Sequence, residues 1–312
     1  MRAYGPVPSR RLGRSLGINN IPPKVCTYSC VYCQVGKTTK MEINRGDFYR
    51  QEDIIKEAKE KVESAKKNRE AIDYLSFVPD GEPTLDINIG DEIDLLKPLE
   101  IKIAVITNAS LIWNDDVKND LLKANWVSLK VDAISEDIWH KINRPHKSLK
   151  LEAILEGALE FANIFKGELA TETMFIQGIN DNEKEIRKIA DFLARLNPNK
   201  AYIAVPTRPP AKKGTRPANE QVITKAYQIF SRNLSNVEYL IGYEGNAFAS
   251  TGNVEDDLLS ITSVHPMREE GINEFLSKTK SDWNIIQKLI KEKKLIEMKY
   301  QGKKFYMRKL HD

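Results

Sequence analysis

The chain has three cysteines, and all of them fall within eight residues, at Cys26, Cys30 and Cys33. An odd number of cysteines packed this closely does not suit a framework of secreted disulfides, and in a reducing compartment it indicates a metal site. A four-iron cluster takes four ligands, usually thiolates. Three cysteines leave one iron open to a ligand from outside the protein, which is what chemistry at a metal centre requires.

Zinc is the main alternative occupant of these thiols. A structural zinc site needs a fourth protein ligand, and the histidines have no finger-like spacing to the cysteines. We therefore interpret the four histidines as structural residues: His140, His146, His265 and His311. A ferredoxin-like electron carrier is also disfavoured, because its cluster needs four cysteines. An iron–sulfur cluster with an open iron is the favoured interpretation.

Short β-rich runs alternate with helical patterns from about residue 14 to about residue 235. The expected strands are apolar on both faces, as buried parallel strands are, and cover Ser15–Asn20, Tyr74–Val78, Lys102–Thr107, Trp126–Val131, Ala170–Ile176 and Ala201–Val205. The expected helices cover Gln51–Lys66, Asp91–Leu96, Asp115–Lys123, Leu151–Phe165, Asn182–Leu196 and Ala218–Leu234.

Six strand–helix units in a row predict an α/β domain with right-handed crossovers and a parallel sheet. Such a sheet binds its ligands at the carboxyl ends of its strands. The cysteine motif follows the first expected strand, so we expect the three thiols to lie at that edge.

The region after about Val254 has a different pattern. Helical stretches at Met267–Leu276 and Ser281–Lys293 precede two short strands at Leu295–Tyr300 and Lys303–Met307. Helices followed by a β-hairpin resemble a winged helix, and a helical cap on the main domain is the alternative. We expect a main domain over 1–240 and a small C-terminal domain over 254–312.

Charge is distributed unevenly along the chain. From Lys278 to Lys309 there are eleven Lys or Arg and three acids, a net charge of +8, which leaves −4 for the remainder of a chain whose total is +4. A basic tail on an acidic body predicts contact with a polyanion, although a solvated lysine-rich surface is an equal alternative. With no long apolar run and no secretory signal, we expect a cytoplasmic protein and no membrane partner.

Cys26-Thr27-Tyr28-Ser29-Cys30-Val31-Tyr32-Cys33, with its aromatic residue before the last cysteine, resembles the signature of the radical S-adenosylmethionine superfamily. The resemblance covers about residues 10 to 210 and implies a partial (β/α)6 TIM-like barrel. It also implies a [4Fe–4S] cluster held by the three cysteines, with S-adenosylmethionine on the open iron. An external donor of the flavodoxin or ferredoxin type would supply an electron. Reductive cleavage would then give methionine and a 5′-deoxyadenosyl radical that abstracts hydrogen from a substrate.

Several strand ends resemble the cofactor-binding positions of this superfamily. Asp80-Gly81-Glu82-Pro83 is similar to its Gly-Glu-Pro element, with Asp80 where many members have glycine, and Thr107-Asn108 is similar to its Thr-Asn-Gly turn, with Ala109 in place of glycine. S-adenosylmethionine presents an ammonium, a carboxylate, a ribose diol and an adenine, which need charged and hydrogen-bonding partners. The resemblance implies that these partners are Tyr32, Gly81, Glu82, Pro83, Asn108, Ser128, Lys130, Asp132 and Asn180.

Four arginines near the expected cavity are candidates for binding an anionic substrate: Arg10, Arg11, Arg144 and Arg208. Within the superfamily the chain resembles small archaeal and bacterial proteins grouped near the wyosine-forming tRNA enzymes, which implies an RNA substrate. A peptide- or protein-modifying enzyme is the second hypothesis. A non-enzymatic iron–sulfur regulator that binds DNA through the basic tail is the third.

Overall fold

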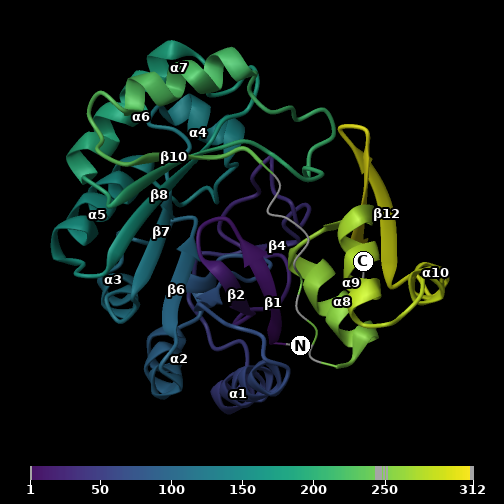
Figure 1. Ribbon diagram of the computed structural model, residues 1–312. Helices are drawn as coiled ribbons and strands as arrows, with labels where there is room; N and C mark the ends of the chain where they lie inside the picture. Colours follow the sequence, from purple (N-terminus) through teal and green to yellow (C-terminus); the bar gives the residue numbers. More distant parts are fainter. Residues whose placement is uncertain (1, 243–247, 249, 251, 310–312) are drawn as a thin grey trace.

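A curled eight-stranded sheet dominates the computed structural model, which describes residues 2–242, 248, 250 and 252–309 (Figure 1). Its strand order is β1-β2-β5-β6-β7-β8-β9-β10. The strands are β1 (Ala3–Ser9), β2 (Gly13–Ile18), β5 (Tyr74–Phe77), β6 (Lys102–Thr107), β7 (Trp126–Lys130), β8 (Glu168–Met174), β9 (Lys200–Ala204) and β10 (Val237–Leu240). All neighbouring pairs are parallel except β1 and β2, which are antiparallel.

Helices cover the outer face of this half-barrel (Figure 1). They are α1 (Gln51–Lys67), α2 (Ile89–Leu96), α3 (Asp115–Leu121), α4 (Glu136–Ile142), α5 (Leu151–Ile164), α6 (Glu183–Leu196) and α7 (Glu220–Phe230). Asparagine side chains cap three of them: Asn114 accepts a hydrogen bond from the Asp116 backbone amide at 2.9 Å, Asn182 accepts one from the Glu185 backbone amide at 3.0 Å, and Asn219 accepts one from the Val222 backbone amide at 2.9 Å. These caps fix where a loop ends and a helix begins at the carboxyl edge of the sheet.

The structure confirms the α/β class and the partial barrel, and it adds two strands to the six expected. The six lie within two residues of their expected bounds. Strand β1 was missed because Pro6 and Pro8 argue against a central strand, but β1 is an edge strand with a register shift between Tyr4 and Val7, where proline is tolerated. Strand β10 was missed because it is a short edge strand that is largely exposed and therefore lacks the apolar run of a buried strand.

Residues after 253 form a smaller unit beside the barrel (Figure 1). Helices α8 (Val254–Val264), α9 (Glu269–Lys278) and α10 (Asn284–Lys291) accompany strands β11 (Met267–Arg268), β12 (Leu295–Tyr300) and β13 (Lys303–Arg308), paired antiparallel in the order β11-β13-β12. Helix α8 was not expected, although Asn253 caps it by accepting from the Asp256 amide at 3.2 Å. The expected domain runs to residue 312, and residues 310–312, with His311, lie outside the described residues.

The N-terminal strand contributes to the core of this smaller unit. Tyr4 and Val7 of β1 are buried in one cluster with Ile261, Met267 and Phe275. The Tyr4 hydroxyl also donates a 3.1 Å hydrogen bond to the Val78 carbonyl, just past the end of β5. Strand β1 therefore pairs with the barrel sheet while its side chains fill the core of the C-terminal unit.

The net charge of the folded C-terminal unit, residues 254–309, is smaller than the net charge of its last part, residues 278–309, indicated. Lys288 and Lys294 form ion pairs with Glu255 of α8 at 2.7 and 3.1 Å, and Lys303 pairs with Glu270 of α9 at 3.3 Å. Over residues 254–309 there are twelve Lys or Arg and nine acids, a net charge of +3. The net charge of +8 was counted over residues 278–309 alone. That count did not include the acids of α8 and α9, which form ion pairs with lysines of residues 278–309.

Within the described ranges, none of the helices has the length and apolar character needed to cross a membrane.

Substituting Tyr4→Ala is expected to lower the free energy of unfolding by about 3–5 kcal/mol, the usual cost of removing a buried aromatic side chain. The loss should be seen in denaturant unfolding of the whole chain, because Tyr4 lies on a strand of the barrel sheet and packs in the core of the C-terminal unit. Tyr239→Ala, at a largely exposed position of edge strand β10, is the control and should cost far less. Equal losses for the two variants would contradict this account of β1.

Candidate functional site

The cysteine loop lies at the carboxyl edge of the sheet, immediately after β2, as expected. Three backbone hydrogen bonds tie it to different strand-end loops: Val25 accepts from the Glu82 amide at 3.2 Å, Ser29 donates to the Asn143 carbonyl at 3.0 Å, and Cys33 accepts from the Ala211 amide at 2.9 Å. Two short strands, β3 (Val25–Cys26) and β4 (Lys40–Met41), stiffen the loop itself. The neighbourhood of each thiol is thereby fixed by a separate part of the barrel.

The three thiols line one cavity of about 290 Å³. All three are partly buried and unbridged. In the described part of the chain, no three Cys, His, Asp or Glu side chains converge on the position of one metal ion. The arrangement thus departs from a mononuclear zinc site, whereas a cube-shaped cluster takes one thiolate on each of three separate irons.

Side-chain amides approach two of the sulfurs. The Asn108 amide nitrogen lies 3.5 Å from Cys26 Sγ, and the Asn143 amide nitrogen lies 3.5 Å from Cys30 Sγ. Hydrogen bonds to cluster ligands shift the reduction potential of the metal centre. Asn108 was expected at the site, but Asn143 was missed, although it precedes Arg144 in a segment singled out for its arginine.

Burial alone disfavours thiolates at this site. It raises the pKa of Cys30 to about 12 and that of Cys26 further still, and nearby carboxylates, Asp132 and Glu82 respectively, add to the effect. A metal cluster would reverse this preference, because coordination replaces the thiol proton with positive charge. The thiols therefore suit a permanent metal ligand set better than a free nucleophile.

Gly81 marks the closest approach of the cysteine loop to a strand end. A Cβ atom at this position would overlap the carbonyl oxygen of Val25 and come within 2.9 Å of the Ile21 side chain. The requirement for glycine here is therefore steric, and it holds the backbone of the Gly-Glu-Pro element beside the thiols.

Glu82 serves mainly to connect strand ends. Its carboxylate accepts hydrogen bonds from the Thr84 hydroxyl at 2.6 Å, the Thr107 hydroxyl at 2.5 Å and the backbone amide of Asn108 at 2.8 Å. Pro83 begins a short 3-10 helix, Pro83–Leu85, and its carbonyl accepts from Asn20 at 3.1 Å. Gly81 and Glu82 line the cavity, while Pro83 supports it from behind.

Asp132 lies behind Tyr32 and does not line the cavity. Its carboxylate accepts hydrogen bonds from the Tyr32 hydroxyl, from the Asn143 amide group at 2.8 Å and from the Met174 backbone amide at 2.9 Å. Asn180 donates to the Asp132 carbonyl at 2.8 Å. Asp132 and Asn180 are thus buried supports rather than cavity-lining groups.

Ser128 does not reach the cavity either. It is buried, and its hydroxyl has no hydrogen-bond partner among the described residues. In contrast, Lys130, two residues further along β7, lines the cavity with its ammonium 5.1 Å from the centre of the Tyr32 ring.

A buried acid organises two basic side chains inside the barrel. Glu172 on β8 forms ion pairs with Arg11 and with Lys130, the latter at 2.6 Å. Burial favours the neutral acid, but the charges of Arg11 and Lys130 outweigh it and hold the pKa of Glu172 at about 2. Sequence reasoning missed Glu172, although an acid inside an otherwise apolar strand pattern was a usable signal.

The C-terminal unit contributes a residue to the cavity. His265, at the end of α8, lines the cavity, and its two ring nitrogens lie 2.9 and 2.8 Å from one guanidinium nitrogen of Arg208. Arg208 also donates to Gln34 at 2.9 Å, next to Cys33. Tyr300 of β12 donates to the Pro206 carbonyl at 3.1 Å. His265 is therefore part of the site, which corrects its interpretation as a purely structural histidine.

The structure brings three of the four expected arginines into the cavity wall: Arg10, Arg11 and Arg208. Arg144 lies outside that wall, which corrects its expected place at the pocket mouth. It is exposed, its φ of 47° puts it in the left-handed region, and its carbonyl accepts from the Ser29 amide at 3.2 Å. Its backbone supports the cysteine loop while its side chain faces solvent.

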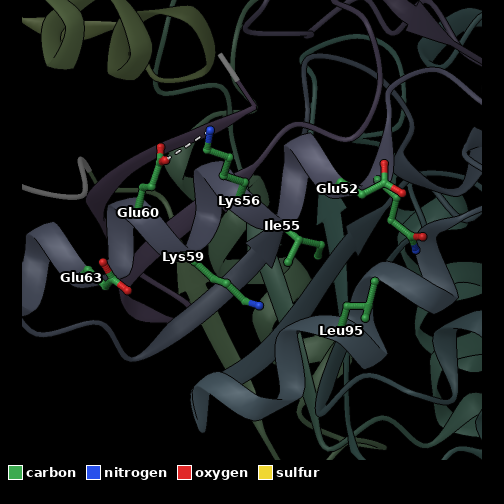
Figure 2. Close-up of a pocket in the computed structure, with 8 residues that line it drawn as sticks. Glu52, Ile55, Lys56, Lys59, Glu60, Glu63 and Leu95 are labelled. Carbon is green, nitrogen blue, oxygen red and sulfur yellow. Dashed lines mark ion pairs between the residues drawn. The ribbon is translucent and has the colours of Figure 1, made fainter.

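A second hollow lies on the helical layer, away from the thiols (Figure 2). It is a groove along α1, lined on one side by Leu95 of α2, and Lys56 and Glu60 of α1 form an ion pair at 3.9 Å along the helix. Its lining offers no thiol and no buried charge. The candidate chemistry of the molecule therefore belongs to the cavity at the strand ends.

Comparison with known proteins gives a consistent result. A family model described as the Radical SAM superfamily matches residues 20–193. The UPF0026 protein of Methanocaldococcus jannaschii is 53% identical over 310 residues, which are 99% of this chain and 96% of that protein.

Two solved structures share the fold. SuiB of Streptococcus suis bound to S-adenosylmethionine aligns with a TM-score of 0.53 and 14% identity, over 72% of this chain. This chain spans 49% of the length of SuiB. TYW1 with a lysine-pyruvate adduct bound aligns with a TM-score of 0.53 and 18% identity, over 71% of this chain and 74% of TYW1.

Substituting Gly81→Ala is expected to displace the Val25 carbonyl and with it the cysteine loop. The overpacking should cost about 1–3 kcal/mol of unfolding free energy and reduce the iron bound after anaerobic reconstitution. Gly46→Ala is the matched control, because an added methyl there meets only Phe48, at 3.9 Å. Normal iron content and stability in the Gly81 variant would show that the close approach is not required.

Proposed function

Since the chain belongs to the radical SAM superfamily, whose members are enzymes that use a [4Fe–4S] cluster and S-adenosylmethionine, we propose that Cys26, Cys30 and Cys33 hold that cluster. The observation that carries this proposal is that the three thiols line one cavity together with charged strand-end residues. When bound, the cluster supplies the electron that cleaves S-adenosylmethionine to methionine and a 5′-deoxyadenosyl radical, which abstracts hydrogen from the substrate.

The chain's own residues hold and orient these groups. Asn108 and Asn143 donate toward the sulfurs of Cys26 and Cys30. Of the residues expected to bind the cofactor, Tyr32, Gly81, Glu82, Asn108 and Lys130 line the cavity and are proposed to contact S-adenosylmethionine directly. Pro83, Ser128, Asp132 and Asn180 are proposed to support that wall from behind.

The substrate is proposed to carry an anionic group. Arg10, Arg11, Lys130 and Arg208 line the cavity, and Glu172 forms ion pairs with Arg11 and Lys130. A phosphate matches the bidentate geometry of arginine, so modification of an RNA, such as a tRNA, is the substrate class that we favour.

We infer that residues 254–309 form a winged-helix domain. The support is the order of the elements, which is helix, short strand, two helices and hairpin. The short strand, β11, pairs with the last strand of the hairpin, β13. Its modest charge of +3 and its contact with Pro206 favour a domain that delivers a substrate to the cavity over one that binds nucleic acid by charge alone.

A peptide or protein substrate is the second candidate. Strand β12 is the open edge of the three-stranded sheet, and its last residue, Tyr300, reaches the Pro206 carbonyl beside the cavity. An extended peptide could add to this edge and run toward the thiols. A solved structure of SuiB is bound to the precursor peptide SuiA. The hypothesis of a non-enzymatic regulator is dropped, because membership of the superfamily indicates an enzyme.

An external electron carrier of the flavodoxin or ferredoxin type is proposed to reduce the cluster. We propose that the protein works in the cytoplasm, where thiols stay reduced until the cluster is assembled on them.

Cys30→Ala is expected to abolish both cluster binding and catalysis, because one iron would lose its protein ligand. Iron content, cluster absorbance and 5′-deoxyadenosine release should be measured after anaerobic reconstitution under a strong chemical reductant. Ser29→Ala, which keeps the backbone hydrogen bond to Asn143, is the control and should retain all three. Full iron content and activity in the Cys30 variant would rule out the proposed function.

Arg11→Ala is expected to weaken the response to substrate while leaving cluster content intact. In wild type, a tRNA fraction should stimulate 5′-deoxyadenosine release more than a peptide fraction does. Loss of one charge-assisted hydrogen bond should reduce that stimulation roughly tenfold. Arg14→Ala is the control, since Arg14 is exposed at the start of β2. Stimulation by peptides alone would move the proposal to the second candidate.

A further inference from the structure

Exposed basic side chains surround the outer side of the cysteine loop. Lys37 and Lys40 lie on the loop itself, Arg144 and Lys147 follow α4, and two more lysines follow β9. We define the basic rim as these six exposed residues: Lys37, Lys40, Arg144, Lys147, Lys212 and Lys213.

Hydrogen bonds hold each part of the basic rim against the thiol-bearing backbone. On one side, the Lys212 amide donates to the Val31 carbonyl at 3.1 Å, and the neighbouring Ala211 amide donates to the Cys33 carbonyl at 2.9 Å. On the other, the His146 amide donates to the Thr27 carbonyl at 2.9 Å. The segments that carry these cations are thus in direct backbone contact with the segment that carries the thiols.

The charge of the basic rim is available to a partner. Within the described residues, Lys37, Lys212 and Lys213 form no ion pair, and Lys40 has only Glu42 at 4.0 Å. In the C-terminal unit, by contrast, Lys288 and Lys294 pair with Glu255 of α8, and Lys303 pairs with Glu270 of α9. Unpaired cations gathered around one loop create a local positive potential that attracts an acidic partner.

An electron carrier is the occupant that this location favours. The inner side of the loop faces the cavity, where Arg208 and His265 close one wall. Cys33 is partly exposed, and its carbonyl accepts a hydrogen bond from the Ala211 amide, next to Lys212 and Lys213 in the chain. Encounters between electron-transfer proteins are small and weak, and charge complementarity sets their association rate.

We propose that the basic rim is the docking surface for a small acidic electron carrier of the flavodoxin or ferredoxin type, which reduces the cluster from the Cys33 side. The inference rests on the proposed function, since it needs a cluster on the three thiols. The carrier is oxidised by one electron and the cluster is reduced by one electron. No atom or proton has to pass between the two proteins in this step.

The test compares two triple variants of the reconstituted full-length protein. Lys37→Gln/Lys212→Gln/Lys213→Gln removes three charges from the basic rim. Lys59→Gln/Lys66→Gln/Lys67→Gln removes three exposed charges from α1, the helix seen in Figure 2, and is the matched control. Anaerobic stopped-flow absorbance measures reduction of the cluster by a reduced acidic flavodoxin across a range of salt concentrations.

Wild type and the control should show a second-order rate constant that falls steeply with salt. The rim variant should react at least tenfold more slowly at low salt and lose most of the salt dependence. Reduction by photoreduced deazaflavin, a small molecule that needs no docking surface, should be equal in all three proteins. Binding of oxidised flavodoxin should weaken in the rim variant alone.

An unchanged rate with flavodoxin in the rim variant would overturn the proposal, as would an equal loss with deazaflavin, which indicates damage to the cluster site. Loss of tRNA affinity with unchanged reduction by flavodoxin would assign the surface to nucleic acid instead. Wild type could also bind flavodoxin through the basic rim and yet release no 5′-deoxyadenosine when it is reduced by deazaflavin. That result would refute the proposed function but would leave the docking surface in place.

Discussion

The contact between the cysteine loop and the strand ends is the constraint on which the rest of the site depends. At Gly81 the two backbones are so close that no side chain fits between them. The same loop is bound at Ser29 by the segment after α4 and at Cys33 by the segment after β9. Three thiols on a loop would otherwise be mobile, and these bonds give them positions relative to one another and to the barrel.

Charge is arranged differently on the two sides of that loop. Inside, Glu172 forms ion pairs with both Arg11 and Lys130 and so orients these two partly buried cations. Outside, Lys37, Lys212 and Lys213 form no ion pair with any residue that the structure describes. Paired charge suits a site that must recognise a bound group with a defined geometry, and unpaired charge suits a surface that must attract a partner and release it.

Sequence reasoning located the thiols, the six central strands and the edge where they meet, because those follow from local patterns and spacing. It could not locate Asn143 or His265 at the site, since only the tertiary fold brings Asn143 to the Cys30 sulfur and His265 to the cavity. Strand β1 was hidden by its prolines, which an edge position tolerates. The charge of the C-terminal segment was overestimated because the acids of α8 and α9 precede the lysines they neutralise. Patterns within a segment were thus predictable, and pairings between distant segments were not.

Strand β1 also has a consequence for how the molecule is made. Tyr4 and Val7 are synthesised before the barrel, but their core partners, such as Ile261 and Phe275, are synthesised after it. Domains usually fold in order from the N-terminus as they emerge. Here β1 cannot complete its packing until residues 254–309 have been synthesised, so the core beneath this edge of the sheet forms only after the whole barrel has emerged.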